Sequence, residues 1–218
     1  MKYLRLWDLN SKEMKLAIFF SGIGYTNDKP LMYYSRKLLQ ELGYEELCVE
    51  YHDLPSKVRG DKMMLLQAAN MAFEQAKEKL EEFDFSKYEE IVLVGKSIGT
   101  YLAVKIAKEI GAGAIAEKSS AVALMPKMKL VLYTPVEATF LPEIDAAEVG
   151  EVFADAIAFI GDNDPWSKLD EVKRLAIVRK VPLHLYKDCN HSLETGDCLA
   201  NIEILGLVMR LTKEYLNK

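Results

Sequence analysis

Short apolar runs alternate with longer segments of helical periodicity along this chain. Six runs are apolar over most of four or five consecutive positions, a pattern typical of strands buried on both faces of a sheet. They occupy residues 16–20, 47–51, 91–94, 130–133, 156–160 and 183–186. Residues 3–9 alternate loosely, and Asn10-Ser11-Lys12 could turn this segment back as an antiparallel edge strand. The pattern therefore predicts about seven strands.

Between these runs, apolar side chains recur at steps of three and four residues, which indicates amphipathic helices. The clearest helix has Asp61 as its candidate N-cap and carries one apolar stripe: Leu65, Ala69, Ala72, Ala76, Leu80 and Phe83. Further helices are expected at residues 31–42, 98–110, 168–178 and 198–216. Buried strands separated by helices predict a mostly parallel sheet with helices on both faces. We therefore expect residues 1–218 to form a single doubly wound α/β domain.

Charge and composition narrow the class of protein. Half of the 218 residues are apolar, and 28 Lys and Arg against 33 Asp and Glu leave a net charge of −5. This balance lacks the basic footprint of a dedicated nucleic-acid or anionic-membrane binder. The apolar runs are far shorter than the ~18–20 residues of a membrane span, and three cysteines do not make a disulfide framework. We expect a soluble, cytoplasmic protein without nucleic-acid or membrane partners, and a homodimer is one candidate assembly.

The most informative motif is Gly-x-Ser-x-Gly, formed by Gly95-Lys96-Ser97-Ile98-Gly99. It stands between a predicted strand and a predicted helix, where the tight turn lifts a serine above the end of the sheet. The backbone N–H of Ile98 then lies at a helix N-terminus and can stabilise a developing oxyanion. A phosphate-binding loop is disfavoured, because no glycine precedes Gly95 by five residues. Ser97 is therefore the candidate nucleophile.

A nucleophilic serine needs a base, and the base needs an orienting acid. His191 lies in a polar loop just past the last predicted strand, at the sheet edge where such folds bind ligands. Asp164 stands three residues after the glycine that follows the fifth strand, and it is our candidate acid. Glu137, beyond the preceding strand, is the alternative acid. His184, inside a predicted strand, is interpreted as structural.

Taken together, these motifs resemble the α/β-hydrolase family. Ser97, Asp164 and His191 follow one another in that family's order, and the resemblance extends over residues 16–216. The resemblance implies a second oxyanion donor from the loop Ser21-Gly22-Ile23-Gly24-Tyr25, namely the N–H of Ile23. The chain carries Ser21 where many members have histidine. It looks most like the small, lidless bacterial serine hydrolases and esterases of the family.

These residues predict a serine hydrolase that cleaves a small carboxylic ester through an acyl-enzyme. This chemistry requires neither a metal nor an organic cofactor. A thioesterase, an amidase or peptidase, and an acyltransferase could use the same residues, and a non-catalytic binding protein of this fold is the alternative in another class. The candidate lid is a minimal one at about residues 134–155, with room for one short helix, and the loop at residues 111–129 is similar in length, so neither forms a multi-helix lid. We therefore expect short acyl substrates.

Overall fold

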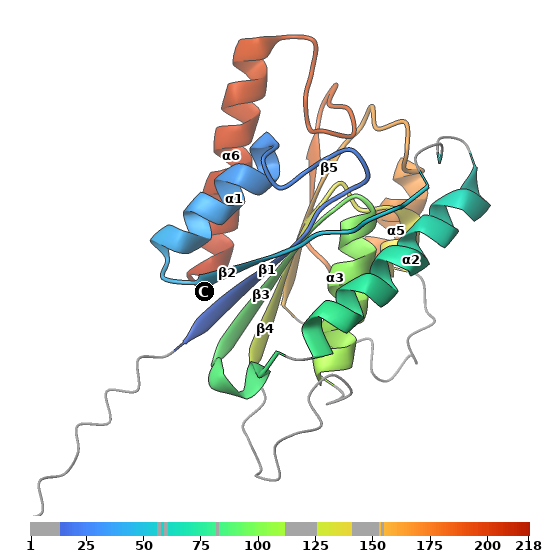
Figure 1. Ribbon diagram of the computed structural model, residues 1–218. Helices are drawn as coiled ribbons and strands as arrows, with labels where there is room; N and C mark the ends of the chain where they lie inside the picture. Colours follow the sequence, from blue (N-terminus) through green and yellow to red (C-terminus); the bar gives the residue numbers. More distant parts are fainter. Residues whose placement is uncertain are drawn as a thin grey trace, which may run out of the picture.

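A six-stranded parallel sheet is the framework of the protein in the computed structural model. The structure describes residues 14–55, 58, 61–81, 83–111, 126–140, 153 and 155–218. The strand order of the sheet is β2-β1-β3-β4-β5-β6 (Figure 1). The strands are β1 (Lys15–Phe20), β2 (Glu45–Val49), β3 (Glu90–Lys96), β4 (Lys127–Tyr133), β5 (Ala156–Gly161) and β6 (Leu183–Tyr186). The predicted edge strand at residues 3–9 and most of the predicted lid lie outside the described residues.

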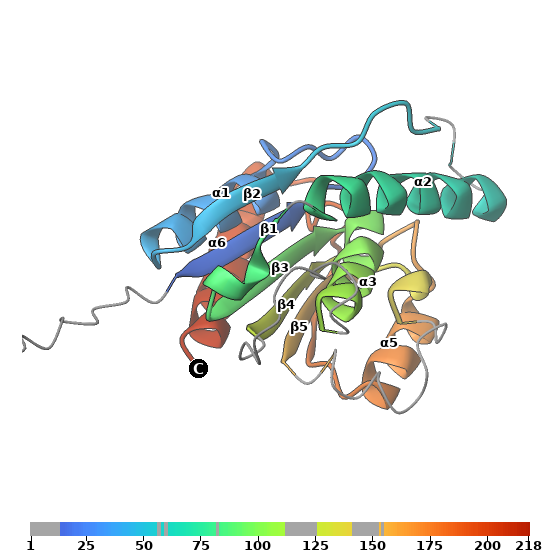
Figure 2. The same cartoon turned by 60° about the horizontal axis from the view of Figure 1, so that its bottom comes forward.

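Helices cover both faces of this sheet, as the alternating pattern predicted. One face carries α1 (Pro30–Glu41) and α6 (Cys198–Leu216), which lie side by side (Figure 1). The opposite face carries α2 (Lys62–Glu81), α3 (Ile98–Gly111) and α5 (Leu169–Val178) (Figure 2). Two short 3-10 turns, η1 (Phe85–Lys87) and η2 (Glu137–Phe140), precede β3 and follow β4. The described residues thus form a single doubly wound α/β layer structure.

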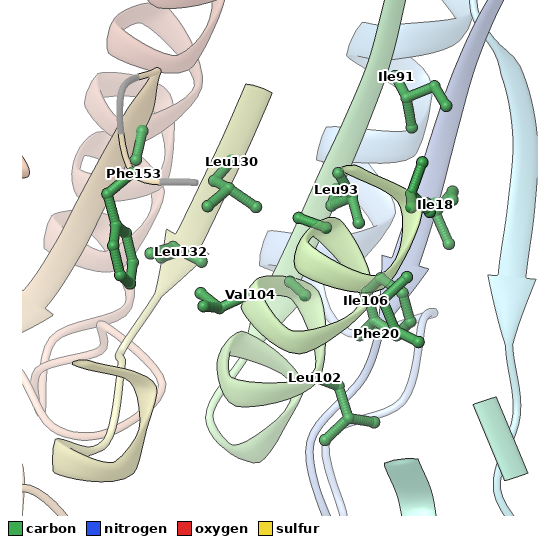
Figure 3. Packing of buried hydrophobic residues seen from close by; sticks show 14 of the residues in the cluster. Ile18, Phe20, Ile91, Leu93, Leu102, Val104, Ile106, Leu130, Leu132 and Phe153 are labelled. Carbon is green, nitrogen blue, oxygen red and sulfur yellow. The ribbon is translucent and has the colours of Figure 1, made fainter. Parts of the chain in front are cut away.

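The core has two halves because strand side chains alternate between the two faces of the sheet. On β3, Ile91 and Leu93 pack toward α3, whereas Val92 and Val94 pack toward α1 and α6. Figure 3 shows the first half, with side chains of β1, β3 and β4 meeting those of α3. The same alternation places Lys96, the last residue of β3, on the face of Val92 and Val94.

Most predicted elements are confirmed, and one strand is displaced. The expected strand at residues 47–51 is β2 at Glu45–Val49, because β2 pairs with β1 and ends where β1 ends, at Phe20 opposite Val49. β2 is at the edge of the described sheet, so polar Glu45 and Glu46 are tolerated there. Asp61 caps α2 as predicted, since its carboxylate accepts the N–H of Met64 at 3.0 Å.

Candidate active site

Three polar residues follow three strands at the same edge of the sheet. Ser97 comes directly after β3, Asp164 follows β5, and His191 follows β6. Parallel strands bring their carboxyl ends to one edge, and the strand order reverses between β1 and β3. Open α/β sheets bind ligands at such a reversal, because the loops on either side diverge and leave a crevice.

The backbone around Ser97 forms a sharp turn from strand to helix. Ser97 has a φ of 57°, which is in the left-handed region that residues with a side chain rarely adopt. Its N–H donates to the carbonyl of Tyr133 at 3.0 Å, and its own carbonyl accepts the N–H of Thr100 at 2.9 Å. These bonds hold the strained conformation in place. A strained turn of this kind is the nucleophile elbow that the sequence motif predicted.

The two glycines of the motif permit this turn to pack closely. A Cβ added to Gly99 would overlap the backbone of Phe20 at the end of β1, and one added to Gly95 would overlap the backbone of Gly99. The first turn of α3 therefore lies directly against the end of β1. This close approach explains why glycine stands on both sides of the x-Ser-x triplet.

Ser97, His191 and Asp164 form a continuous chain of hydrogen bonds. The imidazole Nε2 of His191 lies 2.8 Å from Ser97 Oγ, and its Nδ1 lies 2.7 Å from Asp164 Oδ2. The second carboxylate oxygen of Asp164 accepts the N–H of Trp166 at 2.9 Å. Donation from Nδ1 to the carboxylate leaves Nε2 free to accept the serine proton. This arrangement suits the activation of a serine for acyl transfer.

Burial and the nearby charge of Lys96 favour the neutral form of His191. The imidazole is 17% exposed, and the Asp164 side chain beside it is fully buried. Burial lowers the pKa of His191 below its ordinary value of about 6.5. The hydrogen bond that His191 donates to the Asp164 carboxylate and the negative charge of that group oppose this shift, and the positive charge of Lys96 lowers the pKa further. A histidine that is neutral at pH 7 is in the form that can accept a proton.

The loop that carries His191 is fixed to the loop that carries Asp164. A Cβ on Gly161, at the end of β5, would overlap the carbonyl group of Cys189. The same carbonyl accepts the N–H of Asn163 at 3.0 Å. On the other side of His191, the N–H of Asn190 donates to the carbonyl of Glu194 at 2.9 Å. These contacts position the base opposite the acid before any substrate binds.

The two predicted oxyanion donors come from the first turn of α3 and from the loop after β1. Ile98 is the first residue of α3, so its N–H lacks the carbonyl partner found inside a helix. Ile23 lies in a tight turn closed by two reciprocal backbone bonds of 3.2 Å between Gly22 and Tyr25. A Cβ on Gly22 would lie 3.1 Å from the Cβ of Ser97, so this turn directly adjoins the serine. The donor role of both N–H groups stays a prediction.

The alternative residues lie elsewhere. Glu137 is in η2, and its carboxylate accepts the N–H of Lys168 at 3.2 Å, whereas Asp164 is the carboxylate on His191. His184 stacks on the ring of Phe159 with centroids 5.2 Å apart, which is the structural role that its place in a strand predicted.

Two neighbours of the site were not singled out from the sequence. The half-buried ring of Trp166 lies 6.0 Å from the imidazole of His191, centroid to centroid. Lys96 is fully buried beside the serine. The available signals were an aromatic residue two positions after the acid, and a charged residue at the end of an otherwise apolar strand. Neither signal predicts which other side chains Trp166 and Lys96 lie beside in the folded protein.

Comparisons with known proteins agree with this geometry at the level of fold. No family model and no curated protein matches the chain. Solved structures do match it, among them an α/β serine hydrolase homologue from Coxiella burnetii, with 19% identity, TM-score 0.53, and coverage of 91% of this chain and 84% of that one. An α/β serine hydrolase without a lid from Xanthomonas campestris has 14% identity, TM-score 0.55, and coverage of 92% and 82%. Dienelactone hydrolase from Anabaena variabilis has 16% identity, TM-score 0.56, and coverage of 93% and 85%.

The chain therefore has the α/β-hydrolase fold, as the order of its motifs implied. The six described strands are one fewer than the seven expected, and the segment predicted to form the seventh lies outside the described residues. Within the described part of the chain, no helix combines the length and the apolar character needed to cross a membrane.

Proposed function

We propose that this protein is a serine hydrolase that cleaves small carboxylic esters. The observation that carries the proposal is the hydrogen-bonded chain from Ser97 through His191 to Asp164, built on a strained turn at the carboxyl edge of the sheet. A serine hydroxyl is a weak nucleophile at neutral pH unless a neighbouring base removes its proton. Here the base is neutral, within hydrogen-bond reach, and oriented by a buried carboxylate.

The reaction has two halves. Ser97 Oγ attacks the acyl carbon while its proton passes to His191 Nε2, and the Asp164 carboxylate stabilises the resulting imidazolium. The tetrahedral oxyanion accepts hydrogen bonds from the N–H groups of Ile98 and Ile23. Collapse expels the alcohol, which takes the proton from His191, and leaves an acyl-enzyme. His191 then deprotonates a water molecule that releases the acid and regenerates Ser97.

The likeness to dienelactone hydrolase supports an ester, and the shortness of the lid segment supports a small substrate. Dienelactone hydrolase and a serine hydrolase without a lid share the fold, and a lidless site suits a small substrate. The segment available for a lid is only 22 residues long, from Thr134 to Asp155, and it contains Pro135, Pro142 and Gly150. A thioesterase, amidase or acyltransferase would use the same residues, so substrate preference decides among them.

Labelling with a fluorophosphonate probe tests the nucleophile. The wild-type protein is expected to gain one adduct on Ser97, and Ser97→Ala to lose both the adduct and all hydrolysis of p-nitrophenyl acetate. Ser192→Ala is the matched control, because Ser192 lies beside His191 but takes no part in the chain of hydrogen bonds. An adduct mapped to Ser192, or unchanged hydrolysis by a folded Ser97→Ala variant, contradicts the proposal.

A substrate panel tests the bond that is cleaved. Matched p-nitrophenyl esters, thioesters and anilides of the same short acyl groups are compared by kcat/KM. We expect the esters to be hydrolysed best. A preference for the thioester or the anilide would reassign the substrate class, and the absence of any turnover or labelling would favour a non-catalytic binding protein.

A further inference from the structure

A buried lysine ends β3 immediately before Ser97. The side chain of Lys96 is 0% exposed and lies on the apolar face shared by Val92 and Val94. Its ammonium nitrogen finds no hydrogen-bond partner within the described part of the chain. Burying an ammonium group without a hydrogen bond opposes folding, and an apolar side chain of similar length would avoid this penalty. Lys96 therefore calls for a functional explanation.

The surroundings of Lys96 belong to the candidate active site. Its ammonium lies 4.7 Å from the ring centroid of Tyr25, the residue that closes the turn beside Ser97. The negative charges that act on it are those of Asp164, from the loop after β5, and Glu194, from the loop before α6. Its own charge acts on His191, from the loop after β6. The charged and titratable groups that act on Lys96, or on which it acts, thus lie in the loops that build the candidate active site.

A second buried lysine shows what a structural role looks like in the same sheet. Lys129 on β4 is 1% exposed, but its ammonium donates to the carbonyl of Leu216 at 2.8 Å and pairs with Glu90 at 3.5 Å. These partners join the end of α6 to the start of β3, far along the strands from Ser97. Lys129 has satisfied contacts and a structural explanation. Lys96 has neither.

We propose that Lys96 is a positioning residue for hydrolysis, one whose buried charge holds His191 in the neutral form that accepts the proton of Ser97. The inference rests on the proposed function of this site. The Tyr25 ring is the surface on which the ammonium is held, since the face of an aromatic ring attracts a cation. From there the charge opposes protonation of the imidazole without touching the substrate.

The direction of the effect follows from the charges. Burial raises the pKa of the Tyr25 hydroxyl to about 12, so the ring stays neutral. Burial lowers the pKa of Lys96 to about 7, although Asp164 and Glu194 oppose the shift. Below that pH, Lys96 is charged and repels a proton from His191. The two groups titrate in neighbouring ranges, so their titrations are coupled.

The pH dependence of kcat/KM in Lys96→Met tests this role. Loss of the charge should raise the pKa of His191 and move the acid limb of the profile upward by about half a unit to one unit. That shift corresponds to a loss of about three- to tenfold in relative kcat/KM on the acid limb. Lys129→Met is the matched control, a buried lysine removed from the same sheet, and its profile should keep the wild-type midpoint. An unshifted Lys96→Met profile, or an equal shift in both variants, overturns the proposal.

A measurement without substrate keeps the test decisive if Lys96→Met does not fold. In wild-type protein, the NMR resonances of the His191 imidazole should titrate in two steps, one of them near pH 7 from Lys96. In Lys96→Gln, the His191 resonances should titrate in one step, at a higher pH than the His191 step of the wild type. A single step in the wild type overturns the inference. If no ester is hydrolysed, the proposed function fails, while this titration still decides whether Lys96 controls the protonation of His191.

Discussion

Replacing Asp164 with asparagine should remove most of the activity and leave the fold intact. The carboxylate is fully buried, and both of its oxygens are used, one by His191 Nδ1 at 2.7 Å and the other by the N–H of Trp166 at 2.9 Å. An asparagine of nearly the same size keeps one carbonyl oxygen, which can still accept the N–H of Trp166. The side-chain amide then faces Nδ1 with a donor instead of an acceptor.

The change reverses the protonation pattern of the imidazole. With a donor opposite it, Nδ1 of His191 must accept, so the proton moves to Nε2, the atom that has to take the proton of Ser97 at 2.8 Å. The imidazolium formed during the reaction also loses its buried counter-charge. The equivalent change in a serine-protease triad lowers kcat by about 10⁴, or about 5 kcal/mol in activation free energy. We expect a loss of the same order in kcat.

The matched control is Glu137→Gln. Among the described residues, its carboxylate accepts the exposed N–H of Lys168 at 3.2 Å, and a glutamine oxygen can do the same. Its kcat should stay within about threefold of wild type, because exposed hydrogen bonds contribute little. Initial rates with a short p-nitrophenyl ester measure both variants, and circular dichroism confirms that they fold. A folded Asp164→Asn variant that keeps a tenth of the wild-type kcat, or a larger loss in Glu137→Gln, would refute the assignment of the acid.

Three further outcomes are expected. Burial is the largest influence on the pKa of His191 and lowers it, so kcat/KM should rise with pH along a limb centred below about 6.5. A flat profile from about pH 5 to 8 would exclude a histidine base. Gly161→Ala forces a Cβ onto the carbonyl of Cys189 and should lower the free energy of unfolding by about 2 kcal/mol or more. Gly206→Ala, in open space on α6, is the control and should raise the free energy of unfolding by up to about 1 kcal/mol. Equal denaturant midpoints for the two variants would contradict this expectation. Among p-nitrophenyl esters, kcat/KM should peak at short acyl chains, since an open site gains less than ~0.8 kcal/mol per methylene; a steady rise to long chains would reveal a lid or tunnel.

The local pattern was sufficient to predict the helices and strands. Apolar runs of four or five residues marked β1, β3, β4 and β5, whose apolar side chains are buried in the sheet. A similar run marked β6, although β6 lies at the edge of the described sheet and is only partly buried. The 3.6-residue stripe and Asp61 marked α2 and its first turn. β2 was misplaced by two residues, since its limits are set by pairing with β1 rather than by its own residues.

Part of the candidate site could also be predicted from the sequence, and part could not. Ser97, Asp164 and His191 could be selected from the sequence, because each stands in a turn directly after a predicted strand and parallel strands end at one edge. The sequence favoured Asp164 and kept Glu137 as the alternative, and the structure shows the carboxylate of Asp164 on His191 and that of Glu137 on the N–H of Lys168. Both acids follow strands, so the local pattern ranked them but did not show which carboxylate contacts His191.

The sequence by itself determined the order of the elements and the residue types at the strand ends, because both depend on neighbours a few positions away. Only the tertiary structure decided which side chains meet across the strand ends. Lys96 and Glu194 are 98 positions apart, and their proximity depends on the order in which β3, β5 and β6 lie in the sheet and on the path of two loops. Electrostatic coupling depends on distance in space, and distance along the chain does not predict it.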